Sequence, residues 1–204
     1  MAKLTITTFL TLDGVMQAPG GPSEDPSGGF KHGGWLVPYA DPDMGQFMTE
    51  VFDRADAFLL GRGTYQIFAA HWPRVTDPAD PIAARLNALP KHVASKSLEQ
   101  VSWHKSELVR NVVDEIAALK SRYERELQVH GSHGLAQTLI EHDLVDEYNL
   151  LVYPLTLGTG KRLFASAVPT ALKQTSTRVT STGVIIATYE RAGRPTYGSF
   201  ALDG

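Results

Sequence analysis

The stretch Ala57–Phe68 joins an apolar strand to a helix through two glycines. Its first four residues predict a short buried strand that ends at Gly61. Gly63 allows a tight turn after the strand. Thr64 can then cap a helix that starts one residue later. Free backbone N–H groups at such a helix N-terminus suit a phosphate group, and Arg62 inside the turn offers a planar fork for one. An ordinary strand–helix turn with a solvated arginine fits the same pattern equally well.

A second stretch later in the chain has the same organisation. Residues 127–129 predict a strand, residues 131–134 a glycine-bracketed turn, and residues 135–140 a helix, which together predict a second anion site. The turn and the first residue of the predicted helix are Gly131, Ser132, His133, Gly134 and Leu135. His130 and His133 have no third ligand at metal spacing, so we expect no metal site.

The composition limits the classes of function open to the chain. Its 204 residues suffice for one domain over residues 1–204, and 43% hydrophobic with 20% charged residues is typical of a globular protein. A net charge of −3 gives no strong field, so we expect neither nucleic acid nor membrane as a partner. The absence of cysteine excludes disulfides and thiol chemistry. The N-terminal residues show no signal-peptide pattern and no apolar run reaches membrane-spanning length, so a cytoplasmic protein is expected.

Residues 17–43 differ from the rest of the chain because they are rich in glycine and proline. Such a stretch is not expected to hold a regular element. Phe30, Trp35 and Tyr39 carry apolar area to bury, which is unusual for a solvated linker. We therefore expect a lid over a functional site. The alternative is that the three rings only pin the loop to the body of the protein.

The remaining pattern alternates strands with helices. Apolar residues on both faces predict a doubly packed strand over 3–11. Further helices are predicted over 43–55, with Asp41 or Asp43 as its cap, and over 83–89 and 108–125. Further strands are predicted over 91–95, 102–104, the residues after Asp146-Glu147, and a hairpin within 175–189. This order predicts an α/β fold with a central, mainly parallel twisted sheet, helices on both faces and an antiparallel C-terminal hairpin.

Several short motifs resemble those of one known family, in the family's order. LLGRGTY resembles the Gly-Arg-x-Thr-Tyr turn of the dihydrofolate reductase-like fold, which binds the phosphates of NADPH there. Leu12-Asp13-Gly14 resembles the loop after the family's first strand, and the 131–134 turn resembles the one that cradles the cofactor diphosphate. Residues 144–164, LVDEYNLLVYPLTLGTGKRLF, are the most specific match and resemble the reductase domain of bacterial riboflavin biosynthesis.

This resemblance implies an NADPH-dependent reductase of a small heteroaromatic compound, pterin-like or pyrimidine-like. The implied cofactor contacts are Gly61, Arg62, Thr64, Ser95 and the residues of the 131–135 turn. Asp13 and Asp43 are the implied acids near the substrate, although a bound water can serve instead. Trp35 and Phe47 are the candidates for contacts with the substrate. Related reductase domains are dimers, so a homodimer is expected.

Two other classes of function remain open at this point. A non-catalytic nucleotide-binding module would have the phosphate-binding turns but no acidic residue facing the nicotinamide. A structural or interaction protein would have the same core but no open cleft. Two generic nucleotide motifs are absent. Leu155 and Arg162 stand where a Walker loop needs Gly and Ser or Thr, and Gln66 replaces the third glycine of a Rossmann fingerprint.

Overall fold

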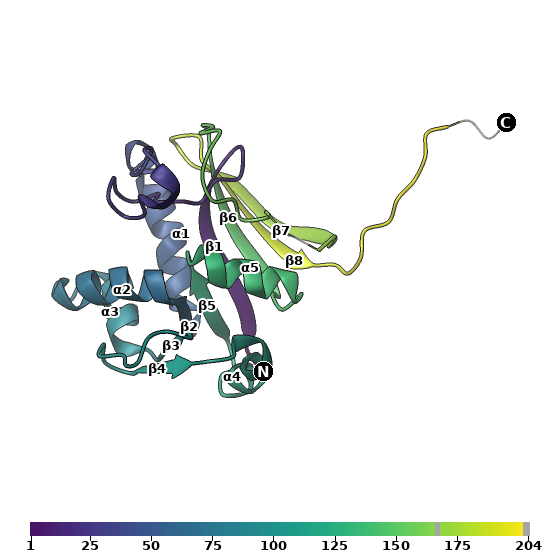
Figure 1. Ribbon diagram of the computed structural model, residues 1–204. Coiled ribbons are helices and arrows are strands. Elements are labelled where there is room, and N and C mark those ends of the chain that lie inside the picture. Colours follow the sequence, from purple (N-terminus) through teal and green to yellow (C-terminus); the bar gives the residue numbers. More distant parts are fainter. Residues whose placement is uncertain (166–167, 202–204) are drawn as a thin grey trace.

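Eight strands form one mixed sheet in the computed structural model, which describes residues 1–165 and 168–201 (Figure 1). The strands are β1 (Lys3–Thr11), β2 (Ala55–Gly61), β3 (Lys91–Ala94), β4 (Ser106–Val109), β5 (Glu126–His130), β6 (Glu147–Tyr153), β7 (Leu172–Val179) and β8 (Ile185–Arg191). Their order across the sheet is β4-β3-β2-β5-β1-β6-β8-β7. Pairs from β4 to β6 are parallel, whereas β8 runs antiparallel to β6 and β7. The predicted α/β fold with its C-terminal hairpin is confirmed.

Helices cover both faces of the sheet. They are α1 (Pro42–Asp53), α2 (Arg62–His71), α3 (Pro81–Ala88), α4 (Val112–Ser121) and α5 (His133–Glu141). One apolar cluster holds side chains of α1, α2 and α3 with the loop before α1, and the other holds side chains of α4 and α5. Figure 1 shows α5 in front of the sheet and α1 behind it. None of the helices described is long and apolar enough to cross a membrane.

The central strands are buried on both faces, as the sequence predicts for β1. Because side chains alternate along a strand, Leu127 and Val129 of β5 enter the cluster under α4 and α5. The other three residues of β5 are polar and face α1. Glu126, Gln128 and His130 are all buried, which is unusual for polar side chains and requires hydrogen-bond partners.

The predicted strand over 102–104 is wrong. The backbone amides of Ser102 and Trp103 donate to the hydroxyl of Tyr65 at 2.9 and 3.0 Å and not to a neighbouring strand. The edge strand β4 follows this turn. The predicted helix over 108–125 is correspondingly shorter, because its first two residues pair with β3 as part of β4.

Helix α2 starts earlier than predicted, which changes the role of Thr64. Gly61 occupies the N-cap position and Arg62 is the first helical residue. The Thr64 hydroxyl therefore caps nothing and instead contacts Ser132. At α1 the cap is Asp41, whose side chain accepts from the Met44 amide at 2.8 Å.

The loop between β1 and α1 is irregular apart from two single 3₁₀ turns, η1 (Ser27–Gly29) and η2 (Val37–Tyr39). Trp35 is 7% exposed, and its Nε1 donates to the carbonyl oxygen of Gln17 at 2.8 Å. The Trp35 ring packs edge-on against Tyr153, with the centroids 5.2 Å apart. Phe30 and Tyr39 pack against the same apolar cluster. The three aromatic residues therefore anchor the loop to the body of the protein.

The C-terminal hairpin leaves β7 at the outer edge of the sheet with most of its residues exposed. Beyond β8 the described chain runs away from the body as an extended tail (Figure 1). Tyr197 and Phe200 lie on this tail with their side chains in solvent.

Candidate functional site

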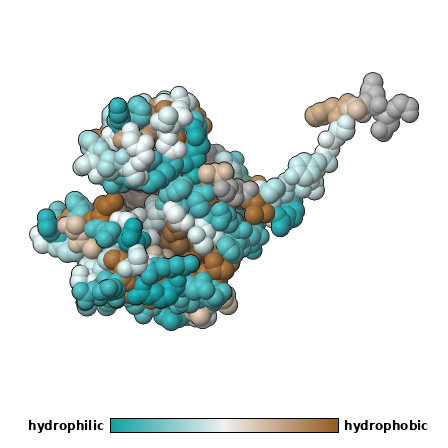
Figure 2. Space-filling view, in the orientation of Figure 1, coloured by the Kyte–Doolittle hydropathy of each residue, from teal (hydrophilic) through white to brown (hydrophobic). Residues whose placement is uncertain are grey.

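A cavity of about 1300 Å³ opens at the carboxyl ends of the central parallel strands. Strands β2, β3 and β5 end at its wall, where the chain passes into loops and helix N-termini. This edge is where ligands bind in open α/β sheets. Figure 2 shows the surface hollowed below the mass formed by the 17–43 loop, with hydrophobic residues at the margin. The volume exceeds the roughly 300–1,000 Å³ of a typical small-molecule site, and so can accommodate a cofactor together with a substrate.

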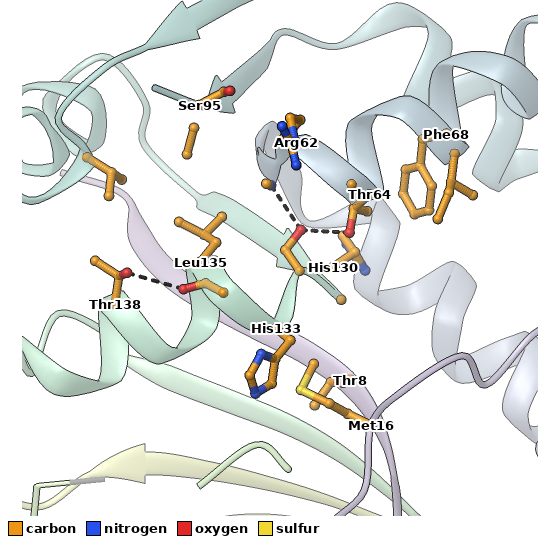
Figure 3. Close-up of a pocket in the computed structure, with 18 of the residues that line it drawn as sticks. Thr8, Met16, Arg62, Thr64, Phe68, Ser95, His130, His133, Leu135 and Thr138 are labelled. Atoms are coloured by element: carbon orange, nitrogen blue, oxygen red, sulfur yellow. Dashed lines mark hydrogen bonds between the residues drawn. The ribbon is translucent and has the colours of Figure 1, made fainter. Parts of the chain in front are cut away.

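Ser132 joins the two glycine turns at this cavity. The Gly61 amide donates to Ser132 Oγ at 2.9 Å, and that hydroxyl donates to Thr64 Oγ1 at 2.7 Å (Figure 3). Gly131 and Ser132 both have a positive φ, of 59° and 62°, so the second turn bends sharply into α5. A side chain in the left-handed region is strained, and such strain often accompanies a functional site.

The N-termini of α2 and α5 thus face one cavity. Each carries unpaired backbone N–H groups and the positive end of a helix dipole, which favours an anion between them. A Cβ built on Gly134 meets nothing within 4 Å, so the backbone there is open to a ligand. All nine residues predicted to contact the cofactor line this cavity: Gly61, Arg62, Thr64, Ser95, Gly131, Ser132, His133, Gly134 and Leu135.

Cations gather at the end of the cavity near β3 and β4. The cations that line it there are Arg62, Lys96 and Arg110. The carboxylate of Asp114 also lines the cavity. Arg62 Nη1 donates to Ser97 Oγ at 3.0 Å, so the guanidinium bridges from α2 to the loop after β3. Figure 3 shows Arg62 and Ser95 together at one side of the view. This end has the chemistry of a phosphate-binding site.

The Ser95 hydroxyl organises that loop. It accepts from the backbone amides of Ser97 and Leu98 at 3.3 and 3.0 Å. Arg110 Nη1 donates to the carbonyl oxygens of Ser95 and Leu98 at 3.0 and 2.6 Å. Ser95 therefore shapes the wall of the cavity as well as lining it.

The opposite wall comes from the loop before α1 and from Lys161. Lys161 Nζ donates to Asp25 Oδ2 at 2.6 Å, and both residues line the cavity with Glu24. Burial raises the pKa of Glu24, although its carboxylate accepts from the Gly20 amide at 2.6 Å. Burial, and then the charge of Lys161, lower the pKa of His133. The carboxyl group of Glu24 is thus held in a partly desolvated place at the ligand space.

Asp13 does not line the cavity. Its carboxylate accepts from the Thr11 hydroxyl at 2.6 Å and from the amides of Leu157 and Gly158 at 3.2 and 2.8 Å. Arg162 adds an ion pair at 3.3 Å. Led by the Thr11 hydroxyl, the hydroxyl and amide donors lower the pKa of Asp13 to about 2. The structure therefore uses Asp13 to hold the Leu12-Asp13-Gly14 loop against the Leu157–Phe164 segment.

The three other residues expected near the substrate also lie outside the lining of the cavity. Asp43 accepts from the Ser181 amide at 2.9 Å, which connects α1 to the β7–β8 hairpin. Trp35 is in the core of the loop. Phe47 is 4% exposed, with the Arg178 guanidinium 4.8 Å from the centroid of its ring. The apolar face of α1 does contribute to the lining of the cavity, but the residues that do so are Met48 and Phe52.

The sequence reasoning missed Met48, Phe52, His130 and Glu24 as cavity residues. Met48 and Phe52 belong to the apolar face of α1. The helical spacing of these residues does not indicate which of them lie at the cavity and which lie in the core. His130 directly precedes the second turn, and its position at the carboxyl end of a buried strand was the available signal. Among the described residues no group of three or more His, Cys, Asp or Glu side chains could hold a metal ion.

Comparisons with known proteins agree with the motifs. Residues 2–186 match the model of the RibD C-terminal domain family. The uncharacterised protein YyaP of Bacillus subtilis (strain 168) is 26% identical over 194 residues, which cover 94% of this chain and 96% of that protein.

Solved structures share the fold at lower identity. A provisionally named riboflavin biosynthesis protein from Shewanella sp. PV-4 has a TM-score of 0.70 at 24% identity, covering 94% of this chain and 99% of that one. A pyrimidine reductase-like protein from Corynebacterium diphtheriae has a TM-score of 0.59 at 12% identity, with coverages of 94% and 92%. Dihydrofolate reductase from Enterococcus faecalis, solved with NADP(H), has a TM-score of 0.59 at 16% identity, with coverages of 93% and 96%. The fold is therefore that of dihydrofolate reductase, and the chain belongs to the RibD C-terminal domain family.

Proposed function

We propose that this protein is an NADPH-dependent reductase of a small heteroaromatic compound, pterin-like or pyrimidine-like. The observation that carries the proposal is the bond between the two glycine turns, which directs the N-termini of α2 and α5 at one cavity. Membership of the RibD C-terminal domain family supports it, as do the pyrimidine reductase-like neighbour and the neighbour solved with NADP(H).

The residues around the cavity fit a dinucleotide with a further phosphate. Gly134 leaves its backbone open to a diphosphate, because a Cβ there would extend into empty space. Arg62 and Lys96 offer cations for an additional phosphate monoester at the end near β3. The chain would thus hold the diphosphate by helix N-termini and the adenosine end by cations.

The other part of the cavity suits a flat, uncharged ring. Phe9, Met48 and Phe52 line it with apolar surface, and His130 adds one polar ring. Bound NADPH would supply the hydride, while these side chains position the ring that receives it. The wall formed by residues of the 17–43 loop would exclude water from that site.

We propose Glu24 as the proton source in place of Asp13 and Asp43. It lines the cavity, whereas both aspartates are engaged elsewhere. Its raised pKa keeps the carboxyl group protonated to higher pH than an exposed glutamate, as a general acid requires. A water held between Glu24 and the substrate would serve the same purpose.

A non-catalytic nucleotide-binding module remains the second candidate, because the phosphate turns alone would suffice for it. Cofactor consumption separates the two: the module would bind NADPH and leave it unoxidised with every pterin or pyrimidine offered. An interaction protein would bind neither cofactor nor ring.

Calorimetric titration with NADPH tests the proposal through Gly134→Val. The added Cβ meets no atom within 4 Å, and the side chain extends into the space assigned to the diphosphate, so NADPH affinity is expected to fall at least tenfold, about 1.4 kcal/mol. Gly45→Val is the matched control, since Gly45 is also in the first part of a helix, meets nothing within 4 Å and lies outside the cavity. Wild-type protein that does not bind NADPH would refute the proposal. If both variants bound NADPH with equal affinity, the N-terminus of α5 would not be part of the cofactor site.

A further inference from the structure

Strand β5 carries a row of polar side chains through the core. Glu126, Gln128 and His130 alternate along the strand, so their side chains share the face that α1 covers. Their exposed fractions are 6%, 0% and 6%. Buried polar groups are costly unless they are hydrogen-bonded, so the direction of every bond in this row matters.

The hydrogen bonds run in one direction along the row. Arg54 Nε donates to Glu126 Oε1 at 2.5 Å, and Gln128 Nε2 donates to Glu126 Oε2 at 2.6 Å. The same amide nitrogen donates to the carbonyl oxygen of Val51 at 2.6 Å. A carboxylate and a carbonyl only accept, so the amide group of Gln128 has a single workable orientation. Its oxygen must point toward His130.

The orientation of Gln128 determines the tautomer of His130. Gln128 Oε1 lies 3.0 Å from His130 Nε2. Because an amide oxygen only accepts, Nε2 must carry the hydrogen and donate it. Burial lowers the pKa of His130 to about 3, so the ring is neutral at physiological pH and Nδ1 is an acceptor. The ring stacks on Phe52, with centroids 4.4 Å apart and an interplanar angle of 12°, which fixes its plane.

Nδ1 is the end of this row that opens to the cavity. His130 lines the cavity (Figure 3), and its Nδ1 bonds to no other residue of the described chain. Ser106 Oγ and Gln137 Oε1 are fully buried side-chain atoms without a hydrogen-bond partner in that part of the chain. His130 Nδ1 is not among the atoms of this kind and has no partner, so it keeps some accessible surface in a residue that lines the cavity.

We infer that His130 is a specificity-determining residue whose Nδ1 accepts a hydrogen bond from an N–H group of a heteroaromatic ligand. The class of ligand rests on the proposed function, whereas the tautomer follows from Gln128 alone. An amino group or ring N–H of the substrate has the required chemistry, and so does the carboxamide of a nicotinamide. A ring with only acceptors on that edge leaves Nδ1 facing another lone pair in a desolvated site, and is selected against.

The tautomer can be measured without any ligand. A long-range ¹H–¹⁵N spectrum of the wild-type protein should show His130 with a protonated Nε2 and a pyridine-like Nδ1. Gln128→Met keeps the length of the side chain and removes the acceptor, so the variant should show a mixture of both tautomers. A protonated Nδ1 in the wild type would overturn the inference, even if NADPH binds as proposed.

A pair of isosteric probes tests the recognition. At alkaline pH, where both are neutral, 2,4-diaminopyrimidine should bind the wild type about tenfold more tightly than 2,4-dimethylpyrimidine, which has no N–H group. His130→Phe keeps the stack on Phe52 and should lose this preference, while His104→Phe, an exposed control outside the cavity, should retain it.

The NADPH affinity of the same variants distinguishes the two sources of the N–H group. If His130→Phe weakens NADPH about tenfold and leaves the probe preference unchanged, the partner is the nicotinamide carboxamide. If only the preference is lost, the partner is the substrate. A variant that matches the wild type in both measurements would show that Nδ1 recognises nothing.

Discussion

The Gly61 amide and the Ser132 hydroxyl form a 2.9 Å hydrogen bond between turns that lie far apart in the sequence. The same hydroxyl donates to Thr64, so one side chain joins the N-terminal part of α2 to that of α5. The distance between two sets of free helix amides is thereby fixed before any ligand arrives. This preorganisation is what the proposed cofactor site depends on.

Ser132→Ala should therefore loosen the site as well as the fold. It removes two hydrogen bonds and keeps the backbone strain, because alanine at the same positive φ has a similar steric cost. We expect about 1–2 kcal/mol lower stability in denaturant unfolding and weaker NADPH binding. Ser121→Ala, which loses only a bond within its own helix end, is the control. Unchanged NADPH affinity in a destabilised Ser132→Ala would show that the tie serves the fold alone.

Asp13→Asn should act on stability. The pKa of Asp13 is about 2 in the folded protein against 3.8 for an unperturbed group, so its ionised form stabilises the fold above pH 3.8. That contribution is lost as the pH falls from 3.8 toward about 2. With the side chain 22% exposed, we expect the variant to be about 1–2 kcal/mol less stable near neutral pH.

The pH dependence distinguishes this account from a catalytic Asp13. Thermal unfolding of wild type and Asp13→Asn should converge as the pH approaches 2, whereas Glu141→Gln on the exposed end of α5 should follow the wild type throughout. If Asp13→Asn had normal stability but no turnover, Asp13 would instead be a catalytic residue.

Trp35→Ala decides between a lid and an anchored wall. The ring is 7% exposed, its Nε1 bonds to Gln17, and it packs on Tyr153, so the loss should be about 3–5 kcal/mol. We expect a large fall in melting temperature and little ligand-dependent change in hydrogen exchange across residues 17–43. If Trp35→Ala were stable, and ligands protected residues 17–43 from hydrogen exchange, the loop would instead be a lid.

We also propose that the protein forms a homodimer. The outer strand β7 is exposed along most of its length, with Val179 67% exposed, and Tyr197 and Phe200 lie in solvent on the extended tail. An unpaired edge with apolar side chains nearby is a surface that a second copy can cover. Sedimentation equilibrium should give twice the chain mass, and truncation after Arg191 should weaken the association. A monomer at working concentration would contradict the proposal.

The fold could be predicted because its signals are local and repeated. Period-two burial, glycine turns after strands and the stripe of α1 each report on their own segment. The two glycine turns could be predicted for the same reason, since a strand, a glycine and a helix start are adjacent in the chain. The eight cofactor residues proposed from these turns line one cavity, and so does Ser95.

The residues at the end of the cavity that we assign to the substrate could not be chosen from the sequence. Asp13 and Asp43 have the chemistry of acids, but only tertiary structure shows that Gly158 and Ser181 occupy their oxygens. The register of α1 against the sheet decides that Phe52 and not Phe47 reaches the cavity. The tautomer of His130 depends on the orientation of Gln128, which the carbonyl oxygen of Val51, from another element of the fold, helps to determine.

The most direct test of the proposed cofactor site is the dissociation constant of NADPH, and of NADH beside it, for the wild type and for Arg62→Ala. Arg62 lines the end of the cavity near β3, to which we assign the extra phosphate of NADPH, and its guanidinium also bonds to Ser97. NADH lacks that phosphate. We predict that Arg62→Ala loses about 1.5–3 kcal/mol of NADPH binding, roughly 10- to 150-fold, and little NADH binding. Arg74→Ala, an exposed arginine outside the cavity, should bind both as the wild type does. Equal NADPH affinity of wild type and Arg62→Ala would contradict the account.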